Sequence, residues 1–260
     1  MPTTKEIEQF LFSAAPKELA MSWDNVGLLV GQTEQEVARV LVALDITEEV
    51  VEEAIASGAS LIVAHHPVMN CKWHAVQNVR DDTPQGRVLT KLIQNRIGAI
   101  CMHTNLDIAQ GGVNDILARA LQLENPQPLG EDGCGRHGML RVEMPLEEYL
   151  ALVYKTLHCS GMRYVSAGRP VHHVAVGGGA CWDYYRDALE AGCDTFVTSD
   201  LGYHDFLDAK AAGLNVIDAG HYPTEDLVCP YIVSLLQAQY PTLPVVKSAV
   251  HREVFQYFTL

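Results

Sequence analysis

Apolar residues follow two patterns along the chain, and each pattern predicts its own kind of element. Short continuous runs of aliphatic and β-branched residues indicate buried strands, and an apolar residue every three or four positions indicates an amphipathic helix. The helical spacing predicts helices over about 5–15, 47–58, 86–96, 112–122, 146–158, 181–192, 203–212 and 226–239. The continuous runs predict strands at 26–31, 37–44, 60–64, 98–103, 162–166, 172–179, 194–199 and 214–220. Strands that alternate with helices predict an α/β fold.

The second half of the chain repeats the element order of the first. An overlay without gaps, at an offset of 134 residues, aligns "RVLVAL" with "HVAVGG" and "AIASGASLIVAHH" with "ALEAGCDTFVTSD". It places five identical pairs, which are Val40 on Val174, Val42 on Val176, Ala54 on Ala188, Gly58 on Gly192 and Val63 on Val197. We therefore expect two similar α/β domains from an internal repeat, residues 1–128 and 129–260, with the final helix and strand able to pack back on the first domain.

Histidines and carboxylates follow three of the predicted strands. A doublet of histidines ends "SLIVA", and "HTNLD" and "HYPTE" each place a histidine four residues before a carboxylate. The residues are His65, His66, His103, Asp107, His221 and Glu225. In α/β sheets, ligands collect beyond the carboxyl ends of the strands. We expect these side chains to meet in the cleft between the two domains and to form a metal site there.

The residue types narrow the choice of metal. Imidazole and carboxylate together suit zinc, manganese and ferrous iron, whereas magnesium and calcium prefer oxygen ligands alone. A single catalytic ion needs roughly three protein ligands, so this set favours two ions that share a carboxylate. Such a pair supports hydrolytic chemistry.

Each residue also has a structural explanation when it is taken alone. His103 and His221 fit ordinary strand-end histidines, Asp107 fits a helix cap, and Glu225 fits a first-turn acid that the helix dipole stabilises. The occurrence of three such clusters at equivalent strand ends favours the metal site.

Composition excludes several classes of protein. The formal net charge of −14 and pI near 5.1 leave no broad basic face, which argues against nonspecific binding to nucleic acid or to an anionic membrane. The chain has neither a basic, apolar signal segment at its start nor a run of about 20 apolar residues that would span a bilayer. Seven cysteines without a C-x-x-C pair predict reduced thiols in the cytoplasm.

Weaker features have simpler explanations. "WDNVG" around Asp24 fits a tight turn, and "GGGACWD" at 177–183 lacks the spacing of a phosphate-binding loop. We expect Asp200 to cap a helix, with His204 on the surface, although either could contact a substrate. His172 and His173 begin a strand, so we expect surface positions at the far end from the metal site.

Seven motifs between residues 22 and 225 resemble one family. They are "SWDNVGLLVG", "LDIT", "LIVAHHP", "MHTNLDIAQGGVND", "VAVGGGA", "FVTSD" and "DAGHYPTE". In this order they resemble the Nif-three-like family, also called dinuclear-metal-centre hexameric proteins or GTP cyclohydrolase 1 type 2 homologues. The resemblance implies a toroidal homohexamer of two-domain α/β subunits in the cytoplasm. Each subunit would hold two divalent ions of zinc, iron or manganese.

The resemblance also implies a ligand set. It assigns His66 and Asp107 to one metal and His65 and His221 to the other, with Glu225 bridging both. His103 matches the family's motif without being counted as a ligand. The resemblance therefore implies that His103 supports the ligands from the second shell around the metal or transfers a proton.

The sequence does not decide between two functions. The family name implies a metal-dependent hydrolase that opens the guanine ring of GTP at a cyclic amidine C–N bond and releases formate. The alternative is a non-catalytic hexamer that binds metal as a regulatory scaffold. A small-molecule substrate such as a nucleotide fits the first function, although no motif resembles a guanine pocket or a triphosphate clamp.

Overall fold

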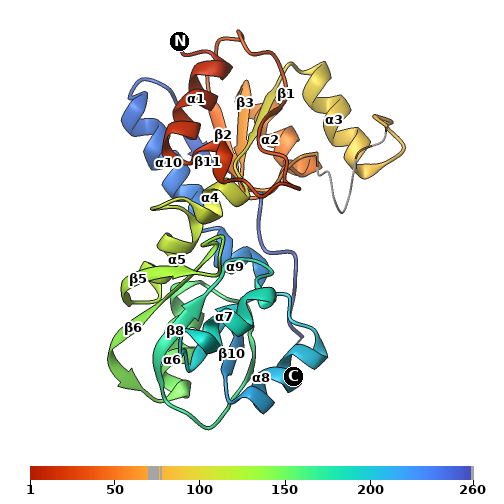
Figure 1. The fold of residues 1–260 in the computed structure, drawn as a ribbon. Helices are drawn as coiled ribbons and strands as arrows, with labels where there is room; N and C mark the ends of the chain where they lie inside the picture. The colour runs from red at the N-terminus through yellow and green to blue at the C-terminus, as the bar shows by residue number, and fades with distance from the viewer. Residues whose placement is uncertain (70–75, 77, 259–260) are drawn as a thin grey trace. The chain divides into compact units, whose positions relative to one another are not determined.

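The chain forms two compact α/β units, each with its own sheet (Figure 1). The computed structural model describes residues 1–69, 76 and 78–258. The first unit contains Met1–Ala109 and Val228–Arg252, and the second contains Gln110–Leu227 and Glu253–Leu260. Mixed α/β units confirm the predicted fold class. The boundary expected after residue 128 falls inside the second unit, and the chain returns to the first unit after residue 227.

The first unit is built on a five-stranded sheet with the order β1-β4-β3-β2-β11. Its elements are α1 (Thr4–Ala14), the 3-10 helix η1 (Lys17–Leu19), β1 (Gly27–Val30), β2 (Val40–Ala43), α2 (Glu48–Ser57), β3 (Leu61–Ala64), α3 (Pro84–Gln94), β4 (Gly98–Cys101), α4 (Thr104–Ile108), α10 (Val228–Gln239) and β11 (Val245–Lys247). Strands β11, β2, β3 and β4 run parallel, and only β1 pairs antiparallel, with β4. The carboxyl ends of β2, β3 and β4 therefore share one edge of the sheet, and β1 begins at that edge.

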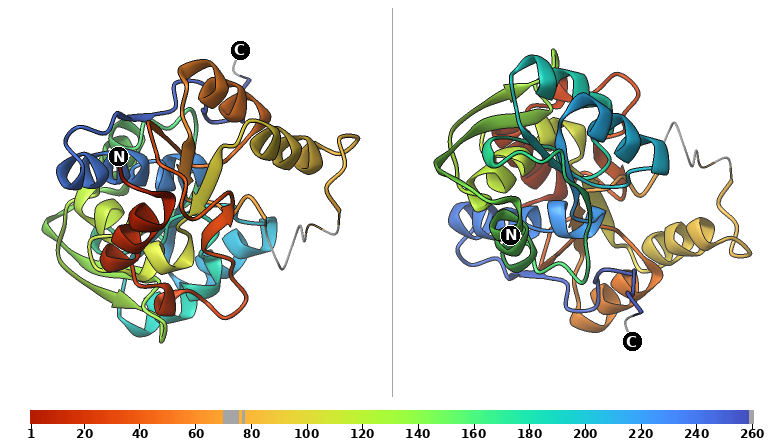
Figure 2. Two further views of the ribbon diagram at one scale, coloured as in Figure 1. Left: turned by 90° about the horizontal axis from the view of Figure 1, so that it is seen from above. Right: turned by 90° about the horizontal axis from the view of Figure 1, so that it is seen from below.

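Helices α2 and α3 cover one face of this sheet and share a hydrophobic core with it. They lie side by side (Figure 2), and Glu48 on α2 makes ion pairs with Arg87 and Lys91 on α3. Strands β2, β3 and β4 are buried along their whole length, as expected for parallel strands covered on both faces. Helix α2 begins at Thr47, whose side chain accepts a hydrogen bond from Val50 N, and ends at Gly58 in a left-handed conformation.

The second unit is built on a six-stranded sheet with the order β5-β6-β8-β9-β10-β7. Its elements are α5 (Val113–Ala120), β5 (Leu123–Leu129), β6 (Gly135–Met144), α6 (Leu146–Thr156), β7 (Arg163–Val165), β8 (Val171–Val176), the 3-10 helix η2 (Trp182–Tyr184), α7 (Tyr185–Glu190), β9 (Thr195–Thr198), α8 (Tyr203–Ala212), β10 (Asn215–Asp218) and α9 (His221–Glu225). Strands β8, β9 and β10 run parallel, and β7 pairs antiparallel with β10. Helices α5 and α6 share one hydrophobic core with the sheet, and α7 and α8 share another.

Both sheets contain the same four-strand arrangement. The order β1-β4-β3-β2 in the first unit corresponds to β7-β10-β9-β8 in the second, with the first strand antiparallel in each. The registers also correspond, because Val40 pairs with Leu61 in the first sheet and Val174 pairs with Thr195 in the second. Both pairs are separated by the offset of 134 residues used in the sequence overlay.

The structure adds a hairpin that the apolar pattern does not predict. Strands β5 and β6 pair antiparallel beside β8, and β5 forms the outer edge of the sheet. Strand β5 contains Pro126, where the register shifts between Glu124 and Gln127, and Pro128, which lies opposite Arg136. Proline lacks the N–H that a central strand needs, which is why it weakens the sequence signal and is tolerated only at such an edge.

Candidate metal centre

Three histidines of the first unit lie together at the carboxyl edge of its sheet. His65 and His66 follow β3, and His103 follows β4. Each offers a ring nitrogen, and these atoms lie within 4.8 Å of one another. The sequence expectation that His65 and His66 lie near His103 is therefore met within one unit.

Each of these rings is held through its Nδ1 atom by an oxygen acceptor. The Nδ1 atoms of His65, His66 and His103 lie 2.7, 2.7 and 2.9 Å from Met102 O, Asp45 Oδ1 and Asp24 Oδ1, respectively. Because a carbonyl or carboxylate oxygen only accepts, Nδ1 donates the proton in each ring. A neutral imidazole held in this way has its lone pair on Nε2. This is the arrangement by which proteins orient histidine for a metal.

Asp107 lies one helical turn after His103, in the short helix α4. Its Oδ1 atom is 3.5 Å from His65 Nε2, and the residue is only 7% exposed. The next helix, α5, begins after Gly112, so Asp107 does not cap it. The H-x-x-x-acid spacing of "HTNLD" is thus a single turn of helix, which brings its two ends onto one face.

Asp24 anchors His103 from the turn before β1. Its Oδ2 atom accepts hydrogen bonds from the N–H and hydroxyl of Thr104, at the start of α4. Burial opposes the charge on Asp24, but the hydrogen bonds and charge of His103, with those of Thr104, lower the pKa of Asp24 to about 2. The carboxylate is therefore ionised at neutral pH and favours a nearby cation.

Asp45 orients His66 in the same way, by accepting a hydrogen bond from its Nδ1 atom. Its second oxygen lies 3.2 Å from His251 Nε2, so the carboxylate lies between two imidazoles. Burial opposes ionisation here too, but the hydrogen bonds from His251 and His66 hold the pKa of Asp45 well below its usual range. The sequence indicates no role for Asp45 and only a turn at Asp24, because these contacts join residues far apart in the chain.

The second unit carries the other two candidate ligands on one turn of α9. His221 Nε2 lies 3.0 Å from Glu225 Oε2, and Glu225 is 4% exposed. His221 Nδ1 bonds to a carboxylate oxygen of Asp200, so this ring is oriented like the other three. Asp200 thus accepts from His221 in addition to any capping role, whereas His204 is exposed on α8.

His221 is held in its positively charged form by the two carboxylates beside it. Burial lowers the pKa of His221, but the carboxylates of Glu225 and Asp200 outweigh burial and raise the pKa to about 11. The imidazole therefore carries a proton between two acids in the metal-free protein. A divalent cation would replace that proton.

The glycine loop after β8 leaves room for Glu225. Gly179 has φ +64°, and a Cβ atom there would lie 2.2 Å from Glu225 Oε1 and 3.1 Å from His221 Nε2. The N–H groups of Gly178 and Gly179 donate to Asn114 Oδ1 and Thr224 Oγ1, so they are not available to an anion. The loop forms a cradle for the carboxylate, and only glycine fits at its narrowest point.

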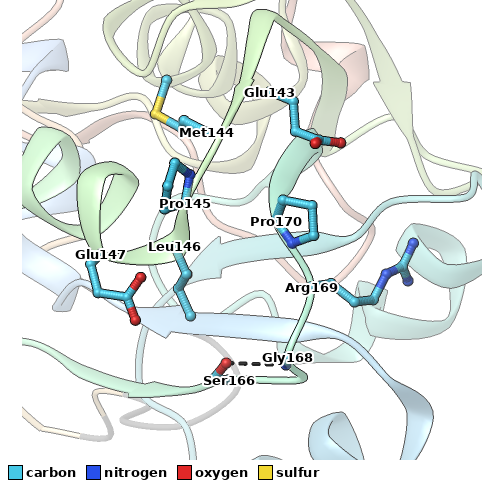
Figure 3. A pocket seen from close by; sticks show the side chains of 9 residues that line it. All are labelled: Glu143, Met144, Pro145, Leu146, Glu147, Ser166, Gly168, Arg169 and Pro170. Atoms are coloured by element: carbon cyan, nitrogen blue, oxygen red, sulfur yellow. Dashed lines mark hydrogen bonds between the residues drawn. The ribbon is translucent and has the colours of Figure 1, made fainter.

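Two cavities of about 410 Å³ lie within the units, and one of them adjoins a candidate ligand. The first-unit cavity is lined by His66 together with Asp45, Thr47, Glu48, Glu49 and Gln85, among others. The second-unit cavity lies at the amino end of β8, between Glu143 and Arg169, and contains none of the candidate ligands (Figure 3). A small molecule in the first-unit cavity would therefore lie next to His66.

Sequence and structure comparisons assign the family. The profile of Duf34/NIF3 (NGG1p interacting factor 3) matches residues 2–253. This chain belongs to the Duf34/NIF3 family. It is 35% identical over 227 residues to a protein of Clostridium perfringens called "GTP cyclohydrolase 1 type 2 homolog", and the match covers 85% of this chain and 86% of that protein. A Streptomyces coelicolor protein of the same name is 38% identical over 237 residues, which cover 86% of this chain and 82% of the relative.

A crystal structure within the family has the same fold. The hypothetical protein SA1388 of Staphylococcus aureus superimposes with a TM-score of 0.91 and 30% identity, covering 98% of this chain and 99% of that one. Among the residues that the structure describes, no helix is long and apolar enough to span a membrane. The described cysteines are buried and none forms a disulfide, while Cys71 lies outside the described residues.

Proposed function

We propose that this Duf34/NIF3 protein holds two divalent metal ions per chain and acts as a metal-dependent hydrolase. The ligands in this proposal are His65, His66, Asp107, His221 and Glu225. His66 and Asp107 would bind one ion, His65 and His221 would bind the other, and Glu225 would bridge them. Zinc, iron and manganese fit a donor set of imidazoles and carboxylates.

The orientation of the four histidines carries the proposal. Each Nδ1 atom faces an oxygen, from Met102, Asp45, Asp24 or Asp200, so each ring is oriented through the same nitrogen. Orientation through Nδ1 is typical of histidines that bind a metal through Nε2. Partners of this kind typically change metal affinity 10–100-fold when they are removed.

The glycine cradle supports the same conclusion independently. Space for the Glu225 carboxylate depends on the missing side chain of Gly179. A buried carboxylate without a cation is costly, and the protonated His221 lies 3.0 Å from the Glu225 carboxylate. The second unit is thus prepared to receive a cation at this point.

Bound divalent ions would lower the pKa of a water molecule and polarise a substrate bond. The protein's own groups complete that chemistry. His103, held by Asp24, has an Nε2 atom suited to moving a proton, since it belongs to the same cluster as His65 and His66. The first-unit cavity beside His66 would hold the substrate.

The relatives' printed name suggests the substrate class. A GTP cyclohydrolase-type reaction opens a cyclic amidine C–N bond of a nucleotide base. This part of the proposal comes from the family alone. We further propose a toroidal homohexamer in the cytoplasm, which the buried thiols of the described cysteines suit.

One observation favours the non-catalytic alternative. The described lining of the first-unit cavity includes Asp45, Glu48 and Glu49 but no lysine or arginine. A triphosphate would need positive charge to offset its own. A metal-binding regulatory scaffold, in which the ions are the cargo and no nucleotide enters, is consistent with that acidic lining.

A paired assay separates the two functions. Metal-reconstituted protein is incubated with GTP and with a panel of nucleotides and phosphoesters, and formate and ring-opened product are measured. The hydrolase predicts turnover that a chelator abolishes and that Asp107→Ala reduces at least about 100-fold. Full metal content without turnover on any substrate of the panel would favour the scaffold.

A further inference from the structure

A second group of metal-type ligands lies in the second unit, on other residues than the candidate centre. His137 on β6, His173 on β8 and Cys193 before β9 each offer one donor atom, and these atoms lie within 4.8 Å of one another. His137 Nδ1 lies 3.0 Å from His173 Nε2. The sequence predicts a surface position for His173, because its neighbours His137 and Cys193 are distant in the chain.

The sheet itself brings the three residues together. His137 pairs with Ala175 across the antiparallel β6–β8 register, and His173 lies two residues before Ala175. Side chains alternate along a strand, so both imidazoles point to the same face. On the other side of β8, the N–H of Asp194 donates to His173 O over 2.9 Å, which fixes the neighbouring Cys193 beside that ring.

We propose that His137, His173 and Cys193 bind one zinc-type divalent cation. Two imidazoles and a thiolate are zinc's preferred protein donors, with water completing four-coordination. Zinc bonds of about 2.0–2.1 Å to nitrogen, in a tetrahedron, place two nitrogens roughly 3.3 Å apart. The observed distance of 3.0 Å between His137 Nδ1 and His173 Nε2 would need to lengthen only slightly to match this value.

The surroundings of the cluster favour a bound cation. Asp194 is 6% exposed and accepts from the backbone N–H groups of His172 and His173, which fixes a carboxylate next to the cluster. A buried carboxylate beside the cluster adds negative charge that favours a divalent ion.

The thiol must lose its proton when the ion binds. Cys193 is 2% exposed, and burial and Asp194 raise the pKa of Cys193 to about 12. Binding therefore exchanges the thiol proton for the cation and releases that proton to solvent. His137 and His173 are only partly buried, so an ion can reach the cluster from solvent.

Cobalt(II) is the probe that separates this cluster from the candidate centre, since the proposed ligands of that centre include no cysteine. Metal-free protein is titrated with Co²⁺, and the near-ultraviolet thiolate-to-cobalt charge-transfer band is recorded. We expect the band in the unmodified chain and in Cys159→Ala, which removes another buried thiol, 4% exposed. Cys193→Ala should abolish it. Zinc content should fall by about one equivalent per chain in Cys193→Ala and not in Cys159→Ala.

A second variant, at a less buried position, tests the proposal if Cys193→Ala does not fold. His137→Asn at a partly exposed position keeps a polar side chain next to His173 and should weaken the cobalt titration about tenfold or more. No thiolate band in the unmodified chain, or a band that survives Cys193→Ala, would overturn the proposal. An unchanged titration in His137→Asn would overturn the ligand role of that histidine and with it the three-residue site.

Discussion

Replacing Gly179 with alanine tests whether the glycine loop exists to admit a metal-binding carboxylate. Two effects act at this position. The φ of +64° is unfavourable for any side chain and costs about 1–2 kcal/mol of stability. In addition, the new Cβ would lie 2.2 Å from Glu225 Oε1, which is about 1 Å closer than a carbon and an oxygen tolerate.

The carboxylate must therefore move by roughly 1 Å, whereas metal–ligand distances hold to about 0.2 Å. We expect Gly179→Ala to weaken the binding of at least one ion about 100-fold, which corresponds to about 2.7 kcal/mol. The stabilisation that metal adds to the folded chain should fall by a similar amount at a fixed free metal concentration.

Gly213→Ala is the matched control. Gly213 lies in the same unit with φ +74°, and a Cβ there meets nothing within 4 Å. Urea unfolding of both variants, with and without metal, separates strain from the clash. The metal-free forms should share the loss that comes from strain, with a further loss in Gly179→Ala from the displaced Glu225 carboxylate, while only Gly179→Ala should lose the metal-dependent part. Equal metal affinity in the two variants would refute the cradle.

The remaining predictions concern ligands, acid stability and assembly. Glu225→Ala should abolish stable binding of at least one ion and Asp107→Ala should mainly weaken one, as elemental analysis after reconstitution would measure; a full metal complement in Glu225→Ala would contradict the bridging role. The folded-state pKa of Asp24, about 2 against roughly 3.9 in the unfolded chain, means that its stabilisation is complete above about pH 4 and disappears toward pH 2. Asp24→Asn should therefore flatten the pH dependence of the urea midpoint in this window, and an unchanged slope would show that the His103 contact adds no stability. Light scattering should give six times 28.6 kDa, and a monomer at micromolar concentration would exclude the hexamer.

Elements with a strong apolar pattern were predictable from the sequence. The parallel strands β2, β3 and β4, and β8, β9 and β10, all fall at predicted runs, because a strand buried on both faces reads as continuous apolar sequence. The hairpin of β5 and β6 has a polar, proline-containing edge, so its pattern carried no comparable signal.

The candidate ligands were predictable as residue types at strand ends, but their supporting contacts were not. Asp24 reaches His103 across 79 positions and Asp45 reaches His66 across 21. Such contacts depend on strand order, which spacing along the chain does not encode. The short helices α4 and α9 were missed for a different reason, since five residues are too few to show a helical period.

The metal content of reconstituted protein tests the central claim most directly. Manganese is the suitable ion, because carboxylate-containing sites accept it and a thiolate cluster disfavours it. Metal-free protein is loaded with Mn²⁺, passed through a desalting column and analysed for manganese against protein concentration. The account predicts about two equivalents per chain. Fewer than one equivalent would contradict a dinuclear centre built from His65, His66, Asp107, His221 and Glu225.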